Sequence, residues 1–144
     1  MIIREMVLED LGEVGNLAEQ LGYPCTSHEL AERFQGIQGD SNVALFVATD
    51  ESAKVVAYMQ INRECQSLLA APRAEVAALV VDQNERGRGI GAQLLQHAEL
   101  WAKKNSLSLI RVRSNIKRTD AHRFYRKCVY ENPKSWHLCT KNIK

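Results

Sequence analysis

One short segment of this chain combines residue types whose spacing favours binding an anion: Arg86, Gly87, Arg88, Gly89, Ile90 and Gly91. This glycine loop, residues 86–91, follows an apolar run at residues 75–81 and precedes a stretch of helical periodicity. Glycine lets a ligand approach backbone N–H groups, and the amides and dipole at the start of a helix favour phosphate. The two arginines can add charge-assisted hydrogen bonds. We therefore expect the loop to hold a pyrophosphate group.

Glycine at alternate positions is weak evidence by itself, because the same residues can simply form a tight turn between a strand and a helix. The chain lacks the Gly-x4-Gly-Lys-Ser/Thr string of a P-loop. A Rossmann loop would open an early βαβ unit and be followed about 20 residues later by an acidic residue, where this chain has Arg111 and Arg113. Both nucleotide-binding folds are disfavoured.

A second motif lies further along the chain and makes the interpretation more specific. Its residues are Ser114, Asn115, Arg118, Ala121, His122, Phe124 and Tyr125. Together with the spacing Arg86-x-x-Gly89-x-Gly91 after the apolar run, this motif resembles the acyl-CoA-binding region of the GNAT-type N-acetyltransferase superfamily. The specific part of the resemblance covers residues 75–130, and the order of the expected elements agrees over the whole chain.

The resemblance implies a fold and an activity. The fold is α/β, with a GNAT-like mixed central β-sheet flanked by helices, in a single domain at residues 1–144. The activity is transfer of acetyl from acetyl-CoA to a primary amine of an unidentified acceptor, by direct attack in a ternary complex without a covalent enzyme intermediate. The alternative is a non-catalytic acyl-CoA-binding module that senses or regulates.

Two residues are candidates for the chemistry. By resemblance, Tyr125 is the general acid that protonates the departing CoA thiolate, and Glu75 accepts the amine proton directly or through water. Such a base helps because an amine with a pKa of about 10.4 is mostly protonated at neutral pH. The sequence leaves simpler roles open: a packed aromatic ring for Tyr125 beside Phe124, and an ordinary strand-end carboxylate for Glu75.

The resemblance also assigns residues to the cofactor. The strand that carries Leu79, Val80 and Val81 is expected to splay from its neighbour, so that main-chain groups bind the pantetheine arm and the thioester carbonyl. The other predicted contacts to acetyl-CoA are Arg86, Gly87, Arg88, Gly89, Ile90, Gly91, Ala92, Asn115, Ala121 and Phe124.

One departure from the family pattern follows Tyr125. The sequence there is Cys128-Val129-Tyr130, where the family commonly has glycine followed by an aromatic residue. Without glycine, a left-handed cap of the helix would cost about 1 kcal/mol. The departure concerns the turn and leaves the tyrosine itself in place.

Hydrophobic periodicity predicts the elements that position these motifs. Helices are expected at residues 11–21, at residues 30–37 after a capping box at Thr26 to Glu29, at residues 94–102 with an end near Asn105, and at residues 120–127. Strands are expected at residues 2–3, 43–48, 55–61, 75–81, 107–112 and 136–140. The second and third strands should form an antiparallel hairpin, and the fourth should be buried on both faces.

Composition and charge exclude several other classes. The net charge of +2 comes from 19 basic and 17 acidic residues, so we expect neither nucleic acid nor a membrane as a partner. The densest basic stretch, residues 111–127, crosses an expected strand, loop and helix and need not form one surface. The chain has no run of the roughly 18 apolar residues of a membrane span. The four cysteines are widely spaced without a CxxC pair, which favours reduced thiols and a cytoplasmic location.

The remaining expectations concern metals, the acceptor and assembly. Single histidines without partners at ligand spacing, such as His28, His97 and His122, are expected to pack or to face solvent, and no metal is predicted. The amine acceptor is expected to be a small molecule or a protein, bound between residues 22–39 and residues 64–72. The last expected strand offers an edge that a second copy could cover, which would make a homodimer.

Overall fold

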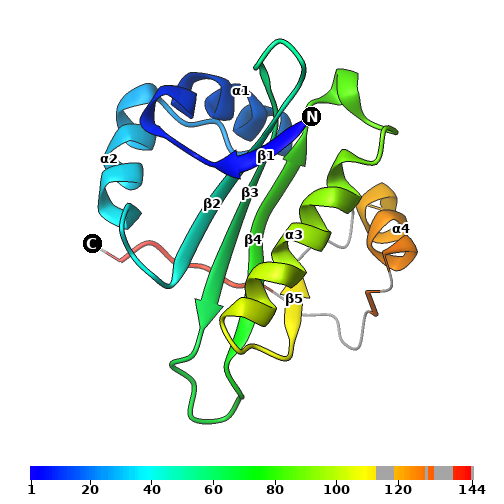
Figure 1. Cartoon of the computed structure of the whole chain (residues 1–144). Helices are drawn as coiled ribbons and strands as arrows, with labels where there is room; N and C mark the ends of the chain where they lie inside the picture. The colour runs from blue at the N-terminus through cyan, green and yellow to red at the C-terminus, as the bar shows by residue number, and fades with distance from the viewer. Residues whose placement is uncertain (113–118, 129, 132–137, 144) are drawn as a thin grey trace. The chain divides into compact units, whose positions relative to one another are not determined.

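The computed structural model describes residues 1–112, 119–128, 130–131 and 138–143. It falls into two compact units, Met1–Arg113 and Ser114–Lys144. The first unit holds a five-stranded sheet and three α-helices, and the second contains the helix α4 (Thr119–Lys127), as Figure 1 shows.

The sheet runs in sequence order, from β1 (Ile2–Glu5) through β2 (Val43–Thr49), β3 (Val55–Glu64) and β4 (Arg73–Val81) to β5 (Ile110–Val112). The first three pairings are antiparallel. For the second and third, short connections from β2 to β3 and from β3 to β4 favour this direction. The helix between β4 and β5 returns the chain to the edge of the sheet at which β4 begins, so this last pairing is parallel. The prediction of a mixed central sheet is confirmed.

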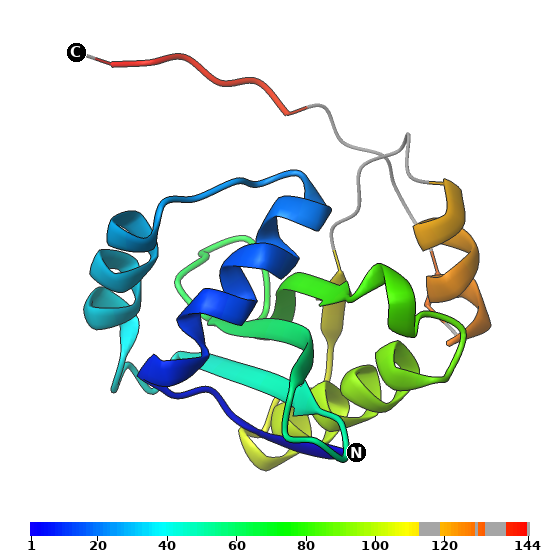
Figure 2. The ribbon, with the colours of Figure 1, turned by 90° about the horizontal axis from the view of Figure 1, so that it is seen from above.

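The helices of the first unit cover both faces of the sheet. Figure 2 shows α1 (Leu11–Leu21) and α2 (Ser27–Ile37) on one side and α3 (Ile90–Lys104) on the other. The α1 side buries a cluster of apolar side chains: Val14, Leu17, Val47, Val55 and Val80. Under α3, the fully buried side chains include Met59, Ile61, Leu94 and Leu95. Helices flank the sheet as predicted.

His97 shows how α3 packs on the sheet. Its ring meets the ring of Phe46 edge to face, with centroids 4.5 Å apart. Burial lowers the pKa of His97 from 6.5, and the charge of Lys104 lowers it further. The neutral ring therefore serves as a packing group, as expected for a histidine without ligand partners.

The prediction that the fourth strand is buried on both faces is wrong. Ala74, Val76 and Val80 are buried, but Ala77 is exposed and Leu79 and Val81 are half-buried. The described pairs with β5 are at Ala74, Glu75 and Val76, and the exposed Ala77 is the first residue beyond them.

The fifth strand begins later than predicted, at Ile110 instead of residue 107. Leu107 N–H bonds to Ala102 O, and Ser106 N–H bonds to Lys103 O, with Ser106 at a φ of 59°. These are the two hydrogen bonds of a Schellman motif, in which an apolar residue after the helix packs back against it. Leu107 is buried for that reason, and it closes α3 without joining the sheet.

The strand expected at residues 136–140 is not found in its described part. Residues 136 and 137 lie outside the described residues, and Leu138, Cys139 and Thr140 are exposed without a strand partner among those described. The residue pattern that predicted a strand is not sufficient, since a strand also needs a neighbouring strand for its backbone hydrogen bonds. The described residues therefore provide no strand edge for the expected homodimer.

In the second unit, α4 carries an aromatic cluster. Phe124 and Tyr125 have ring centroids 5.2 Å apart, and Tyr125 and Tyr130 have theirs 6.2 Å apart. Tyr130 N–H donates to Tyr125 O at 3.0 Å. Val129, where the sequence departs from the family pattern, lies outside the described residues.

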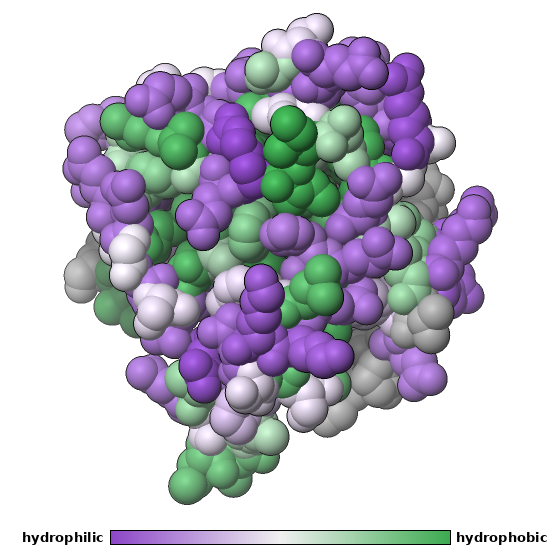
Figure 3. All heavy atoms as spheres, viewed as in Figure 1, coloured by the Kyte–Doolittle hydropathy of each residue, from purple (hydrophilic) through white to green (hydrophobic). Residues whose placement is uncertain are grey.

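The loop between β3 and β4 projects beyond the end of the sheet. It contains Leu68 and Leu69, which are 100% and 95% exposed, and Figure 3 shows the apolar surface at its tip. This loop was expected to help form the acceptor site. Elsewhere, no helix among the residues described is both long and apolar enough to cross a membrane.

Candidate active site

The glycine loop turns the chain from the end of β4 into α3. Gly87 and Gly89 both have a φ of 81°, a left-handed conformation that side chains with a Cβ disfavour. Apart from its chain neighbours, a Cβ added at either position would meet no atom of the described residues within 4 Å, so that part of the chain leaves the surface in front of both glycines open. Backbone conformation thus requires the glycines, and the open space lets a ligand approach them.

The first turn of α3 presents backbone N–H groups without a side-chain cap. Gly89 is the N-cap, and the first helical hydrogen bond runs from Gln93 N–H to Gly89 O at 3.1 Å. The N–H groups of Ile90, Gly91 and Ala92 precede this bond, and the first turn contains no acidic residue. This arrangement suits an anion such as pyrophosphate.

Side chains outside the motif hold the start of the loop. The buried Asp82 accepts a hydrogen bond from Asn84 N–H at 3.0 Å, and Gln83 N–H donates to Gln20 Oε1 of α1 at 2.9 Å. Arg86 Nε donates to Val81 O at 3.2 Å. Sequence reasoning missed Asp82 and Gln20: an aspartate after a strand is a turn signal, but nothing in the sequence pairs Gln20 with a residue so distant.

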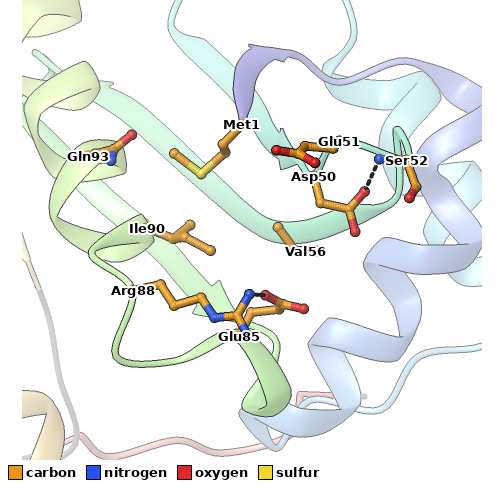
Figure 4. Close-up of a pocket in the computed structure, with 9 residues that line it drawn as sticks. All are labelled: Met1, Asp50, Glu51, Ser52, Val56, Glu85, Arg88, Ile90 and Gln93. Carbon is orange, nitrogen blue, oxygen red and sulfur yellow. Dashed lines mark hydrogen bonds and ion pairs between the residues drawn. The ribbon is translucent and has the colours of Figure 1, made fainter.

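Arg88, one of the predicted phosphate contacts, forms an ion pair with Glu85 at 2.9 Å (Figure 4). Both residues line a hollow of about 490 Å³ between the start of α3 and the β2–β3 turn. Its lining residues are Met1, Asp50, Glu51, Ser52, Val56, Glu85, Arg88, Ile90 and Gln93. Three carboxylates against one arginine make this hollow unsuitable for phosphate.

Of the predicted cofactor contacts that the structure describes, two have buried side chains. Ile90 is 7% exposed and Val80 is 4% exposed, so neither side chain is available to a ligand. Each can contribute only its main-chain groups. The predicted role for Val80 already relied on the main chain, and Ile90 contributes a helix N–H.

The splay predicted beside the fourth strand lies opposite residues 113–118, which are outside the described residues. β5 pairs with Ala74, Glu75 and Val76. The register with β3 shifts so that Ala77 is an extra residue, a β-bulge, at the point where this pairing ends. Main-chain groups of residues 77–81 are therefore the candidates for binding the pantetheine arm and the thioester carbonyl.

Glu75 is held by an ion pair that the sequence did not predict. Its Oε1 accepts hydrogen bonds from Arg111 Nη2 at 2.8 Å and Arg111 Nε at 3.1 Å. The two residues are direct partners on β4 and β5, so both side chains leave the sheet on the same face. Sequence reasoning grouped Arg111 with a solvated basic stretch, because only the strand register reveals its partner.

The remaining predicted residues belong to the second unit. Ala121, Phe124 and Tyr125 lie on α4, and Asn115 lies outside the described residues. Tyr125 contacts two aromatic rings, as the packing alternative required. The structure thus brings together the glycine loop, residues 79–81 and Glu75 in one unit, and the aromatic residues in the other.

The chain is similar to known proteins in sequence and in fold. The Acetyltransferase (GNAT) family matches residues 12–130. An aminoalkylphosphonate N-acetyltransferase from Salmonella typhimurium is 49% identical over 51 residues, which are 35% of this chain and 33% of that protein. The matched stretch thus spans about a third of the relative's length.

Solved structures share the fold at low sequence identity. An aminoglycoside 6'-N-acetyltransferase from Acinetobacter haemolyticus superposes with a TM-score of 0.86 at 15% identity, covering 100% of both chains. AAC(6')-Iy in complex with the bisubstrate analogue CoA-S-monomethyl-acetylneamine also gives 0.86 at 15% identity, covering 99% of this chain and 98% of the other. The fold and the family match agree. The chain belongs to the GNAT acetyltransferase family.

Proposed function

We propose that this protein transfers acetyl from acetyl-CoA to the primary amine of a small molecule, by direct attack in a ternary complex. The observation that carries the proposal is the uncapped start of α3 behind Gly87 and Gly89, directly after the end of β4. These groups suit the two parts of an acyl-CoA that need main-chain donors, the pyrophosphate and the thioester carbonyl.

Each chemical step is assigned to groups of this chain. The amides of residues 87–92 bind the pyrophosphate, and main-chain groups of residues 77–81 hold the pantetheine arm and the thioester oxygen. The amine nitrogen attacks the thioester carbon, forming the C–N bond, and its proton passes to Glu75 directly or through water. The C–S bond then breaks, and Tyr125 gives its proton to the departing thiolate.

A small-molecule acceptor is supported by the names of similar proteins. The Salmonella relative is named for an aminoalkylphosphonate, and the Acinetobacter protein of the same fold is named for aminoglycosides. Both names describe small amines. From these names we infer only that the acceptor of this protein is a small amine.

Release of CoA thiol is the direct test. Purified protein, acetyl-CoA and a broad panel of small amines should release free thiol with at least one amine, and mass spectrometry should find the acetylated product. Binding of acetyl-CoA without thiol release from any amine would identify a binding module instead. Tyr125→Phe keeps the ring and its packing, so kcat should fall about 10²- to 10⁴-fold with little change in the KM for acetyl-CoA. Full kcat in a chemistry-limited reaction would leave Tyr125 only its packing role.

The role of Glu75 can be separated from its ion pair by two matched variants. Glu75→Gln removes both the base and the charge partner of Arg111, whereas Arg111→Gln removes the ion pair and keeps the carboxylate. If Glu75 is the base, kcat at saturating amine falls far more in Glu75→Gln than in Arg111→Gln. Equal losses in both variants would show that Glu75 matters only through the ion pair.

A further inference from the structure

The face of the sheet covered by α1 changes from apolar to polar along β3. Tyr58 packs against the apolar cluster under α1, but the next residues on the same face are Gln60 and Asn62. Tyr58 Oη donates to Gln60 Oε1 at 3.0 Å, and Gln60 Nε2 donates to Asn62 Oδ1 at 3.0 Å. This polar ladder, Tyr58, Gln60 and Asn62, lies in the half of the face beyond the cluster.

The polar ladder has a fixed direction. Burial raises the pKa of Tyr58 to about 12, so its hydroxyl keeps the proton that it donates to Gln60. Each amide in turn uses its oxygen to accept and its nitrogen to donate. The ladder therefore ends at Asn62 Nδ2, an amide nitrogen that can only donate.

Asn62 lies next to the proposed base and to a second arginine. It is the direct partner of Glu75 on β4, so both side chains are on the α1 face. Arg73 lies two residues before Glu75 and shares this face, at about 6.6 Å along the strand. Arg111 pairs with Glu75, and Arg73 places a second guanidinium on this face, opposite Glu64.

Arg73 carries a buried donor that the described residues do not satisfy. Its Nε is buried without a hydrogen-bond partner, and its Nη1 makes only a long contact to Ala71 O at 3.4 Å. Glu64 is directly opposite Arg73 on β3, yet no ion pair joins the two in the described part of the chain. The Nη1 contact is exposed, so an anionic ligand can reach the end of the guanidinium and form charge-assisted hydrogen bonds with it.

We propose that the acceptor amine carries an anionic group, a carboxylate or a phosphonate, which binds Arg73 and Asn62. This inference rests on the proposed function, because it uses Glu75 to place the amine on the same face. A short aliphatic chain then joins the amine beside Glu75 to the anion beside Arg73. The amide nitrogen of Asn62 and the guanidinium of Arg73 are hydrogen-bond donors. They favour a substrate group that accepts hydrogen bonds and carries negative charge.

The first experiment compares matched amines by thiol release. β-Alanine and 2-aminoethylphosphonate supply a planar and a tetrahedral anion on a similar chain, and β-alaninamide and ethanolamine are the neutral counterparts. The better anionic amine should exceed the neutral ones in kcat/KM by about tenfold to a hundredfold. The ratio of the two anionic amines identifies which anion the site takes.

The second experiment uses arginine variants. Arg73→Gln should raise the KM for the anionic amine about tenfold or more and leave the neutral amines unchanged, and Arg73→Lys should fall in between. Arg63→Gln is the matched control, because Arg63 also has a buried Nε without a described partner but is paired with Ala74 on the α3 face. The rise in melting temperature with acetyl-CoA checks that each variant is folded.

The outcomes separate the two proposals. Equal kcat/KM for neutral and anionic amines, with thiol released, overturns the anionic acceptor and leaves the acetyltransferase intact. An equal loss in Arg63→Gln and Arg73→Gln also overturns it. Failure of every amine to release thiol, while acetyl-CoA binds, overturns the proposed function and this inference with it.

Discussion

The N-termini of α2 and α3 differ in how their first backbone N–H groups are satisfied. At α2, Thr26 Oγ1 accepts from Glu29 N–H at 3.1 Å and Glu29 Oε1 accepts from Thr26 N–H at 2.9 Å, a complete capping box. At α3, the N-cap is Gly89 with a positive φ, and no side chain satisfies the first amides. One helix start is closed by its own residues, and the other is left available to a ligand.

The difference shows where the chain gives up stability. A side-chain cap contributes about 0.5–2 kcal/mol relative to alanine, and α3 does without one. An acidic side chain in the first turn of α3 would also stabilise the helix and would occupy the position of an anion. We infer that α2 begins for structural reasons and α3 for binding, and the following predictions test this contrast.

The largest effect is expected when the open helix start receives a carboxylate. Gly89→Asp places a negative charge where we propose the pyrophosphate binds, and like charges at a binding surface cost several kcal/mol. The affinity for acetyl-CoA should fall more than about a hundredfold, measured by calorimetry. Gly39→Asp, at another glycine with a positive φ, is the control for backbone strain. An unchanged affinity in folded Gly89→Asp would place the phosphates elsewhere.

Binding of acetyl-CoA itself should stabilise the protein. A ligand that binds only the native state adds about 2.7 kcal/mol at a hundredfold excess over Kd, which corresponds to a rise in Tm of roughly 5–10 °C for a chain of this size. Differential scanning fluorimetry measures the shift. CoA should act similarly, since it shares the pyrophosphate. The absence of any shift with either compound at millimolar concentration would contradict the cofactor assignment.

A smaller effect is expected at the capped helix. Thr26→Ala removes the side-chain oxygen of the capping box and should cost about 1 kcal/mol, or roughly 2–4 °C in Tm. The Kd for acetyl-CoA should not change, because α2 provides none of the proposed phosphate contacts. A parallel loss of acetyl-CoA affinity would break the distinction between a structural and a binding helix start.

The smallest effect is a change in pH dependence. Hydrogen bonds from the Thr26 backbone and side chain lower the pKa of Glu29 below 4.5, so its contribution to stability is present above that pH and is lost as the pH falls through the native pKa. The Tm difference between wild type and Glu29→Gln should therefore be largest near neutral pH and shrink below about pH 4.5. Glu32→Gln, on the same helix outside the capping box, is the control. A constant difference across the range would contradict the linkage.

The sequence alone determined the features that depend on neighbouring residues. The capping box at Thr26 and Glu29 involves hydrogen bonds three residues apart, and both were read correctly from residue types. The glycine loop and the order of helices and strands were also predictable, because turn conformation and hydrophobic periodicity are local properties of the chain. Local signals also predicted the mixed sheet, through the helix that separates its two parallel strands.

Only the tertiary structure decided which distant side chains meet. Glu75 pairs with Arg111, and Gln83 with Gln20, because strand register and helix packing bring together residues that no local pattern links. The bulge at Ala77 and the late start of β5 were likewise not predicted, since Leu107 has the same residue type whether it joins a strand or caps a helix. The buried Nε of Arg73, without a hydrogen-bond partner among the described residues, is likewise a property of the fold that no sequence pattern indicates. Register is set by the burial of whole faces, so the chemistry of the acceptor side had to come from the fold.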